Sequence, residues 1–119
     1  MIDGTLTRNS EGTYLVAFDR VVKRPIAKVW ADRKSLSGKQ VTVRGKVVKY
    51  NGNVMGLNWI HLQDGSGKEA EHTNDITVTS DAEAKIGETI TATGVVGINK
   101  DLGSGYNYPV IVEKATIAR

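Results

Sequence analysis

The chain has 119 residues, of which 39% are hydrophobic and 24% are charged, and its formal net charge is +3. This length fits one domain with a core of its own, and no apolar run approaches the roughly 18 residues of a membrane-spanning helix. The absence of cysteine excludes disulfides, thiolate metal sites and cysteine nucleophiles. The opening MIDGTLTRNSEG lacks the basic and apolar segments of a signal peptide, so we expect none, although the mature form of a longer precursor would look the same.

The basic residues are concentrated in one part of the chain. Between Arg20 and Tyr50 there are ten basic residues and one acidic residue, Asp32, whereas residues 51–119 contain five basic and nine acidic residues. A basic segment attracts polyanions or anionic surfaces. A solvated helix face and a strand edge protected by lysines would give the same pattern, so both interpretations stay open.

The N-terminal part predicts an extension followed by a helix. Residues 1–24 are expected to lie outside the main domain, as a strand (loose alternation over 13–22) or as a partly disordered segment. Residues 25–36, PIAKVWADRKSL, predict a helix, because Pro25 suits a first turn and Ile26, Val29 and Trp30 form one apolar stripe. Trp30 is expected to anchor this stripe in the core, and Gly38 to end the helix.

From Lys39 onward the apolar period changes to two. Residues 40–50, QVTVRGKVVKY, predict a long strand with alternate valines on the core face, and Gly45 allows a bulge or a bend in its middle. In this alternation Tyr50 shares the outer face with Arg44 and Lys46. Further strands are predicted at 59–63, 75–80, 89–98 and 109–117, and residues 81–88 leave room for one helical turn before Ile86-Gly87.

Five strands with one long bent member predict an all-β fold. The expected architecture over residues 25–119 is a five-stranded Greek-key barrel of the OB type with a short N-terminal α-helix. A sandwich is the alternative, but it needs about seven strands.

Three sequence blocks resemble those of small bacterial OB-fold proteins of the nucleic-acid-binding type. They are MGLNWIHLQDGSG at 55–67, NDITVT at 74–79 and KDLGSGYNYPVIVE at 100–113, and the similarity covers residues 25–117. The resemblance implies a ligand on the outer face of the second and third barrel strands, flanked by the loops 51–58 and 99–108. Many such proteins carry export signals, so an extracytoplasmic location also stays open.

Alternation in the second strand turns Ile60 and Leu62 toward the core and Trp59 and His61 outward. Aromatic residues near this face would stack bases and basic residues would neutralise phosphates. The predicted nucleic-acid-binding residues are therefore Arg44, Lys46, Lys49, Tyr50, Asn58, Trp59, His61, Thr77, Lys100, Tyr106 and Tyr108. In the alternative arrangement, Tyr106 and Tyr108 seal the barrel mouth and Trp59 packs under the Met55 loop.

No sequence motif indicates catalysis. The two histidines, His61 and His72, lack the spacing of a zinc site, and the glycine-rich turns lack the ending of a phosphate loop. We therefore expect a non-enzymatic module without metal or cofactor, whose partner is single-stranded DNA or RNA. The alternative is an extracytoplasmic accessory domain that binds a protein or a glycan, and a haem or metal role through His61 ranks third.

Overall fold

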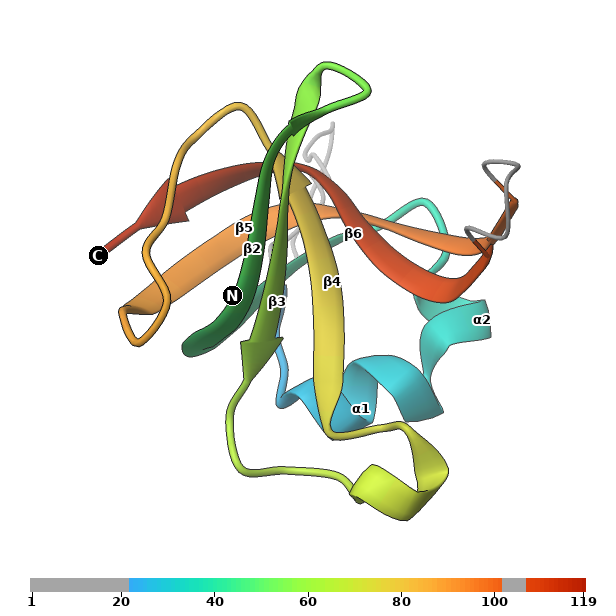
Figure 1. The fold of residues 1–119 in the computed structure, drawn as a ribbon. Helices are drawn as coiled ribbons and strands as arrows, with labels where there is room; N and C mark the ends of the chain where they lie inside the picture. Colours follow the sequence, from blue (N-terminus) through green and yellow to red (C-terminus); the bar gives the residue numbers. More distant parts are fainter. Residues whose placement is uncertain (1–21, 102–106) are drawn as a thin grey trace, which may run out of the picture.

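The computed structural model describes residues 22–101 and 107–119, which form strands and short helices (Figure 1). None of the helices in these ranges is long and apolar enough to cross a membrane. The elements are β1 (Val22–Lys23), α1 (Ile26–Ala31), α2 (Arg33–Leu36), β2 (Gln40–Val54), β3 (Leu57–Gln63), the 3-10 turn η1 (Glu69–Glu71), β4 (Asp75–Ser80), β5 (Thr89–Asp101) and β6 (Asn107–Ala118).

Five of the strands close into a barrel. The hydrogen-bonded order is β2-β3-β4-β6-β5, and β5 pairs again with β2. The β4–β6 pair is parallel and the other four pairs of the ring are antiparallel. This confirms the predicted all-β, five-stranded barrel of the OB type. Of the strand expected over 13–22, only Val22 lies within the described residues, and it begins β1, which pairs in parallel with β2.

The long strand β2 serves two neighbours because it bends at Gly45. Residues 40–46 pair with β5, and residues 46–54 pair with β3. A Cβ at Gly45 would lie 2.7 Å from the backbone oxygen of Gln63, so only glycine lets the two strands approach this closely. The predicted bend in the middle of this strand is thus confirmed.

A bulge at Val48 changes which β2 side chains face outward. Val47 pairs with Leu62 and then Lys49, rather than Val48, pairs with His61. The extra residue reverses the alternation, so Tyr50 pairs with Ile60 and packs against the core cluster. The expectation that Tyr50 shares the outer face with Arg44 and Lys46 is therefore wrong.

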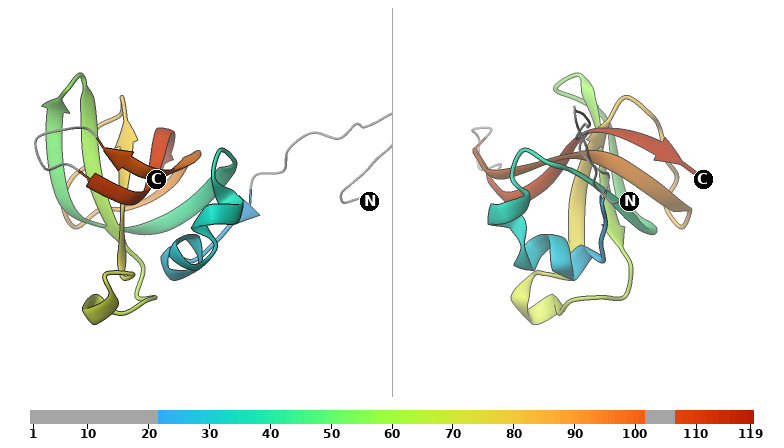
Figure 2. Two further views of the ribbon diagram at one scale, coloured as in Figure 1. Left: turned by 90° about the vertical axis from the view of Figure 1, so that its right-hand side faces the viewer. Right: turned by 180° about the vertical axis from the view of Figure 1, so that it is seen from behind.

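The two short helices lie together at one end of the barrel (Figure 2). Ile26, Val29 and Leu36 are buried in the same core cluster as the barrel valines. Trp30 packs against this cluster, and its indole Nε1 donates to the backbone oxygen of Asp75 at 2.6 Å. The single helix predicted over 25–36 is instead interrupted at Asp32, where φ is −101° and ψ is 14°.

The start of α1 is capped by a loop that lies far along the chain. The Asp64 carboxylate accepts a hydrogen bond from the Ile26 amide at 2.9 Å, and the Ser66 hydroxyl accepts one from the Ala27 amide at 3.0 Å. These side chains satisfy two amides that a helix start leaves without partners. The loop that follows β3 therefore fixes the helix to the barrel.

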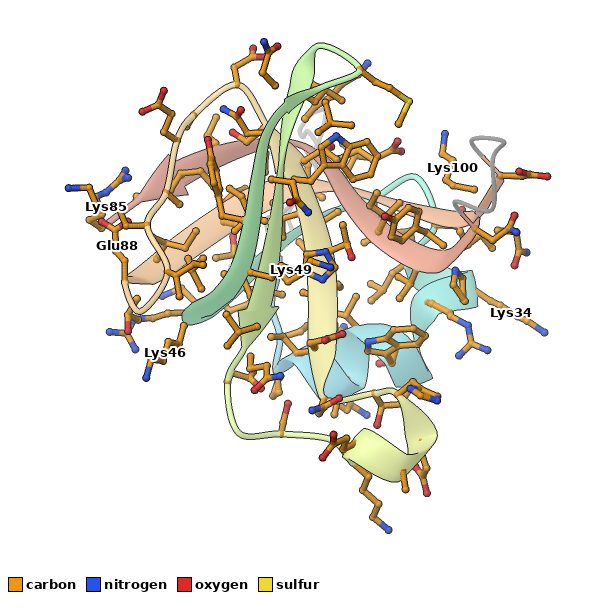
Figure 3. The ribbon with its side chains drawn as sticks, in the orientation of Figure 1. Lys34, Lys46, Lys49, Lys85, Glu88 and Lys100 are labelled. Carbon is orange, nitrogen blue, oxygen red and sulfur yellow. The ribbon has the colours of Figure 1, made fainter. Side chains whose placement is uncertain are left out.

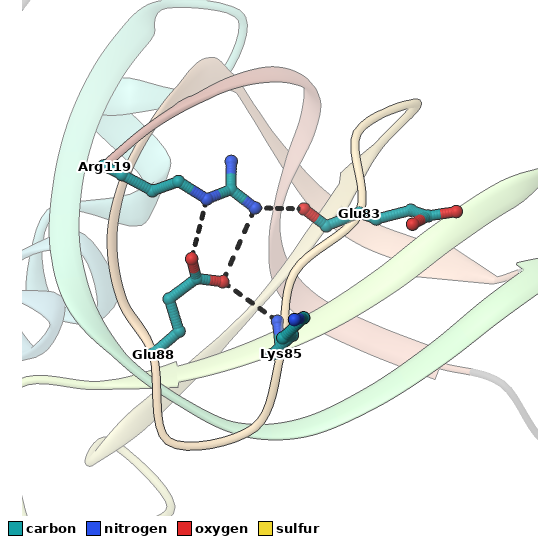
Figure 4. Close-up of polar contacts among 4 residues, drawn as sticks. All are labelled: Glu83, Lys85, Glu88 and Arg119. Carbon is teal, nitrogen blue, oxygen red and sulfur yellow. Dashed lines mark hydrogen bonds and ion pairs between the residues drawn. The ribbon is translucent and has the colours of Figure 1, made fainter.

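The loop 81–88 contains no helical turn, contrary to expectation, and is held by polar contacts (Figure 4). Arg119 Nε lies 2.7 Å from Glu88 Oε2, and its Nη2 donates to the Glu83 backbone oxygen at 2.7 Å. The Lys85 amide donates to Glu88 Oε1 at 3.0 Å. The hydrogen bond from Arg119, followed by that from the Lys85 amide, lowers the pKa of Glu88. These contacts join the loop to the residue after β6.

Candidate nucleic-acid interface

Side chains from β2 and β3 form one row on the outer face of the barrel. The cross-strand pairs in this row are Asn51 with Trp59, Lys49 with His61, and Lys46 with Gln63. Lys46 and Lys49 are exposed, and Figure 3 shows Lys49 over the front of the barrel and Lys46 at the lower left. Within the described ranges neither lysine forms an ion pair. The row therefore offers two free positive charges beside aromatic and polar groups.

Trp59 belongs to this row but is covered. Its ring stacks on that of Tyr108, with centroids 5.6 Å apart and planes 28° apart, and only 6% of the residue is exposed. Its Nε1 donates to the Val54 backbone oxygen at 2.8 Å. Of the two arrangements that the sequence left open, the structure has the one in which Trp59 is covered rather than exposed, with Tyr108 stacked on it.

The covered tryptophan forms the floor of a hollow of about 290 Å³. Four predicted site residues line it, namely Lys49, Trp59, His61 and Tyr108, together with Asn51, Val54 and Met55. The sequence analysis missed Asn51 as a site residue, because the bulge at Val48 that turns it outward leaves no signal in the alternation. The hollow combines one cation, an aromatic pair and an amide.

His61 lies half-buried beside this hollow. Burial lowers the pKa of its imidazole, the nearby carboxylate of Asp75 opposes this shift, and the charge of Lys49 reinforces it. The neutral imidazole is therefore favoured near pH 7, and it offers one hydrogen-bond donor and one acceptor.

Other predicted site residues lie elsewhere or are engaged within the fold. Thr77 pairs with His61 across β3 and β4, but it is 6% exposed, so little of it is accessible to a ligand. The Asn58 side chain accepts a hydrogen bond from the Asn53 amide near the end of β2 and donates to the backbone oxygens of residues 81 and 82, which is a structural role. Lys100 lies 3.4 Å from the Glu113 carboxylate. Tyr106 lies outside the described residues.

Arg44 lies further along β2, next to Lys46 of the row described above. Arg44 and Lys46 are exposed and line a hollow of about 410 Å³ with Gln63 and Asp64. Tyr50 lines a third hollow, with Asn53, Asn58 and Arg119. The predicted residues are thus spread over three regions of the barrel.

Metal binding finds no support in the part of the chain that the structure describes. No group of three or more histidine, aspartate or glutamate side chains there is placed to hold an ion.

Comparisons with known proteins support the fold. No protein-family model matches the chain, and no curated protein matches its sequence. Among solved structures, the chain is similar to asparaginyl-tRNA synthetase of Entamoeba histolytica in complex with asparaginyl-adenylate, with a TM-score of 0.57 and 14% sequence identity. The match covers 84% of this chain but 24% of the synthetase. At this identity the similarity supports the fold alone, an OB-type barrel.

Proposed function

We propose that this chain is a non-enzymatic module that binds single-stranded DNA or RNA along the outer face of β2 and β3. The observation that supports it best is the pair of free lysines, Lys46 and Lys49, in register with Gln63 and His61. Lys49 also lines the hollow that contains the Trp59–Tyr108 stack. OB barrels commonly bind oligonucleotides on the face of their second and third strands, here β3 and β4, and the proposed face adjoins it through β3. The similarity to a tRNA synthetase, an enzyme named for an RNA substrate, agrees with this proposal. The resemblance of three sequence blocks to small bacterial OB-fold proteins of the nucleic-acid-binding type is part of the same proposal.

In this proposal the lysines and the aromatic pair have separate tasks. Lys46 and Lys49 neutralise backbone phosphates and release counterions, which makes binding depend on salt. Tyr108 and Trp59 line the hollow beside Lys49, so a base that enters it would meet their rings, and stacking of a base on an aromatic ring contributes about 1–3 kcal/mol. Neither phosphate contacts nor ring stacking distinguishes one base edge from another, so the module would bind with weak sequence preference.

A fluorescence titration with an oligothymidylate tests the proposal. At low salt we expect the wild-type protein to bind and Lys49→Gln to bind more weakly. Lys85→Gln serves as the control, because Lys85 is also exposed but lies far to the left of Lys49 in Figure 3. The proposal would fail if the wild-type protein showed no change at low salt, or if both variants lost affinity equally.

A glycan partner is the second candidate, and the composition of the hollow favours it. Aromatic rings beside an amide and an imidazole, as in Tyr108, Asn51 and His61, also suit a sugar ring. Signal changes with an oligosaccharide that persist in high salt, without any response to the oligonucleotide, would support this candidate instead.

A further inference from the structure

A fourth hollow, of about 430 Å³, lies where β1 and the start of α1 meet β2. Its lining contains three basic side chains, Lys23, Arg24 and Arg44, and the hydroxyl-bearing residues Thr42, Ser66 and Thr91; Pro25 and Asp64 complete it. We call this hollow the β1 groove. Lys23 and Arg24 were not among the residues predicted from the sequence, because they precede the segment that resembles OB-fold proteins.

Asp64, the acidic residue of the β1 groove, already has hydrogen-bond partners within the protein. Asp64 accepts hydrogen bonds from the Ile26 and Ser66 amides, each at 2.9 Å, and from the Ser66 hydroxyl. Burial by itself would raise the pKa of Asp64, but these hydrogen bonds together lower it. Its carboxylate is therefore ionised and directed to the helix start and its own turn, so it only partly offsets the three cations.

The basic side chains of the groove retain binding capacity. Among the described residues, Lys23 and Arg44 form no ion pair. Arg24 Nη1 lies 3.9 Å from Asp32, beyond hydrogen-bond length, and its buried Nε has no hydrogen-bond partner. An unpaired buried donor is rare in folded proteins. The Arg24 side chain is also 32% exposed, and the planar fork of a guanidinium matches the geometry of a phosphate.

The β1 groove is continuous with the candidate interface along β2. Arg44 and Asp64 line both the β1 groove and the adjoining 410 Å³ hollow, which also contains Lys46 and Gln63. The Lys46–Gln63 pair adjoins the Lys49–His61 pair of the front row. Arg44 and Lys46 are two residues apart, or about 7 Å along a strand. Free cations therefore follow β2 from Lys49 around the barrel to Lys23.

From this continuity we infer that the β1 groove binds a phosphodiester group of the same single strand that occupies the front face. The inference rests on the proposed function and extends it: the bound strand follows β2 around the barrel, rather than only crossing β3 and β4. Strand length then decides whether the groove is used. A short oligonucleotide fills the front row, and a longer one also reaches Arg44 and Lys23.

Two oligothymidylates, of roughly 4 and 12 nucleotides, test this inference by fluorescence titration at low salt. Both lengths fall within the range of about 4–16 nucleotides that single OB barrels bind. The variants are Lys23→Gln/Arg44→Gln for the groove, Lys49→Gln for the front row, and Lys34→Gln as a control. Lys34 is an exposed lysine on α2, on the right of Figure 3. Thermal unfolding of each variant shows whether the fold is kept, since all four residues have exposed side chains.

The expected result depends on length. Loss of two phosphate contacts should weaken binding of the longer strand about tenfold in the groove variant and leave that of the shorter strand unchanged. Lys49→Gln should weaken both, and Lys34→Gln neither. The inference would be overturned if the groove variant bound the longer strand with full affinity, or if it lost affinity equally for both lengths. In either case weaker binding by Lys49→Gln would still support the proposed function. A wild-type protein that bound neither strand would overturn both.

Discussion

At the scale of single residues, the stack of Tyr108 on Trp59 controls access to the candidate interface. Tyr108 comes from β6 and Trp59 from β3, two strands that do not pair directly. Replacing Tyr108 with alanine removes the cover while leaving the indole bound to the Val54 oxygen. We expect acrylamide to quench the fluorescence of Tyr108→Ala more strongly than that of the wild-type protein.

The second tryptophan provides the control for this experiment. Trp30 lies at the other end of the barrel, where it binds Asp75, so a Trp59→Phe background isolates its signal. If quenching increased equally in that background, the change would come from Trp30 and the stack would not shield Trp59.

His61 should make nucleic-acid binding stronger in mild acid. Its pKa is lowered by burial, with Asp75 opposing and Lys49 reinforcing the shift, so its positive charge appears only when the pH falls below the ordinary value of about 6.5. That charge would add to Lys49 in the front row. Lowering the pH from about 7.5 to about 5.5 should therefore tighten oligonucleotide binding in the wild-type protein but not in His61→Gln.

The same shift has the opposite effect on folding. Because the folded state disfavours the protonated imidazole, the contribution of His61 to stability is present above the unfolded pKa and is lost as the pH falls.

For the binding experiment, equal pH dependence in the wild-type protein and His61→Gln would show that a group other than His61 is responsible.

At the scale of elements, the bend in β2 depends on the absence of a side chain at Gly45. A methyl group there would lie 2.7 Å from the Gln63 backbone oxygen, which belongs to the partner strand and has little freedom to move. Gly45→Ala should therefore lower the free energy of unfolding by about 1–3 kcal/mol, the usual cost of overpacking. Urea denaturation measures this, with Thr89→Ala, an exposed position on the neighbouring strand β5, as the control. A Gly45→Ala protein as stable as the wild type would show that the close approach is not required.

The cap on α1 should make the docking of this helix sensitive to acid. Asp64 is held ionised by the Ser66 hydroxyl and by two backbone amides, against the effect of burial. Because its pKa is lower in the folded state, the stability that it adds is present above the unfolded pKa, near 4, and is lost as the pH falls further. Asp64→Asn should cost about 1 kcal/mol at pH 7 and flatten the acid limb of a stability-versus-pH curve. An unaltered acid limb would mean that other carboxylates dominate it.

The elements themselves could largely be predicted from the sequence, whereas their irregularities could not. The predicted strand 75–80 coincides with β4, and the strand beginning at Gln40 was found with its bend, because apolar alternation and glycine report on these features locally. The bulge at Val48 depends on how β2 registers against β3, so alternation alone placed Tyr50 on the wrong face. The cover on Trp59 comes from Tyr108, 49 positions later, and no local pattern could indicate it.

At the scale of the whole molecule, closure of the barrel distributes a basic stretch of sequence over several surfaces. Lys34 lies on α2, Lys49 on the front face, and Lys23 and Arg44 at the β1 groove. The basic segment is thus divided: some of its lysines are solvated helix residues, and those on β2 lie in one row with Arg44. The lysines on β2 differ from those on the helices because they pair with residues of β3, and this pairing exists only in the folded protein.

The salt dependence of single-strand binding tests the central claim most directly, namely that free cations on β2 contact a nucleic-acid backbone. We would measure the affinity for an oligothymidylate over a range of salt concentrations, for the wild-type protein and for Lys46→Gln/Lys49→Gln. For a single strand each lost phosphate contact lowers the slope of log affinity against log salt by about 0.7, so the double variant should show a slope shallower by about 1.4. Identical slopes for the two proteins, or no binding by the wild-type protein at low salt, would contradict the account.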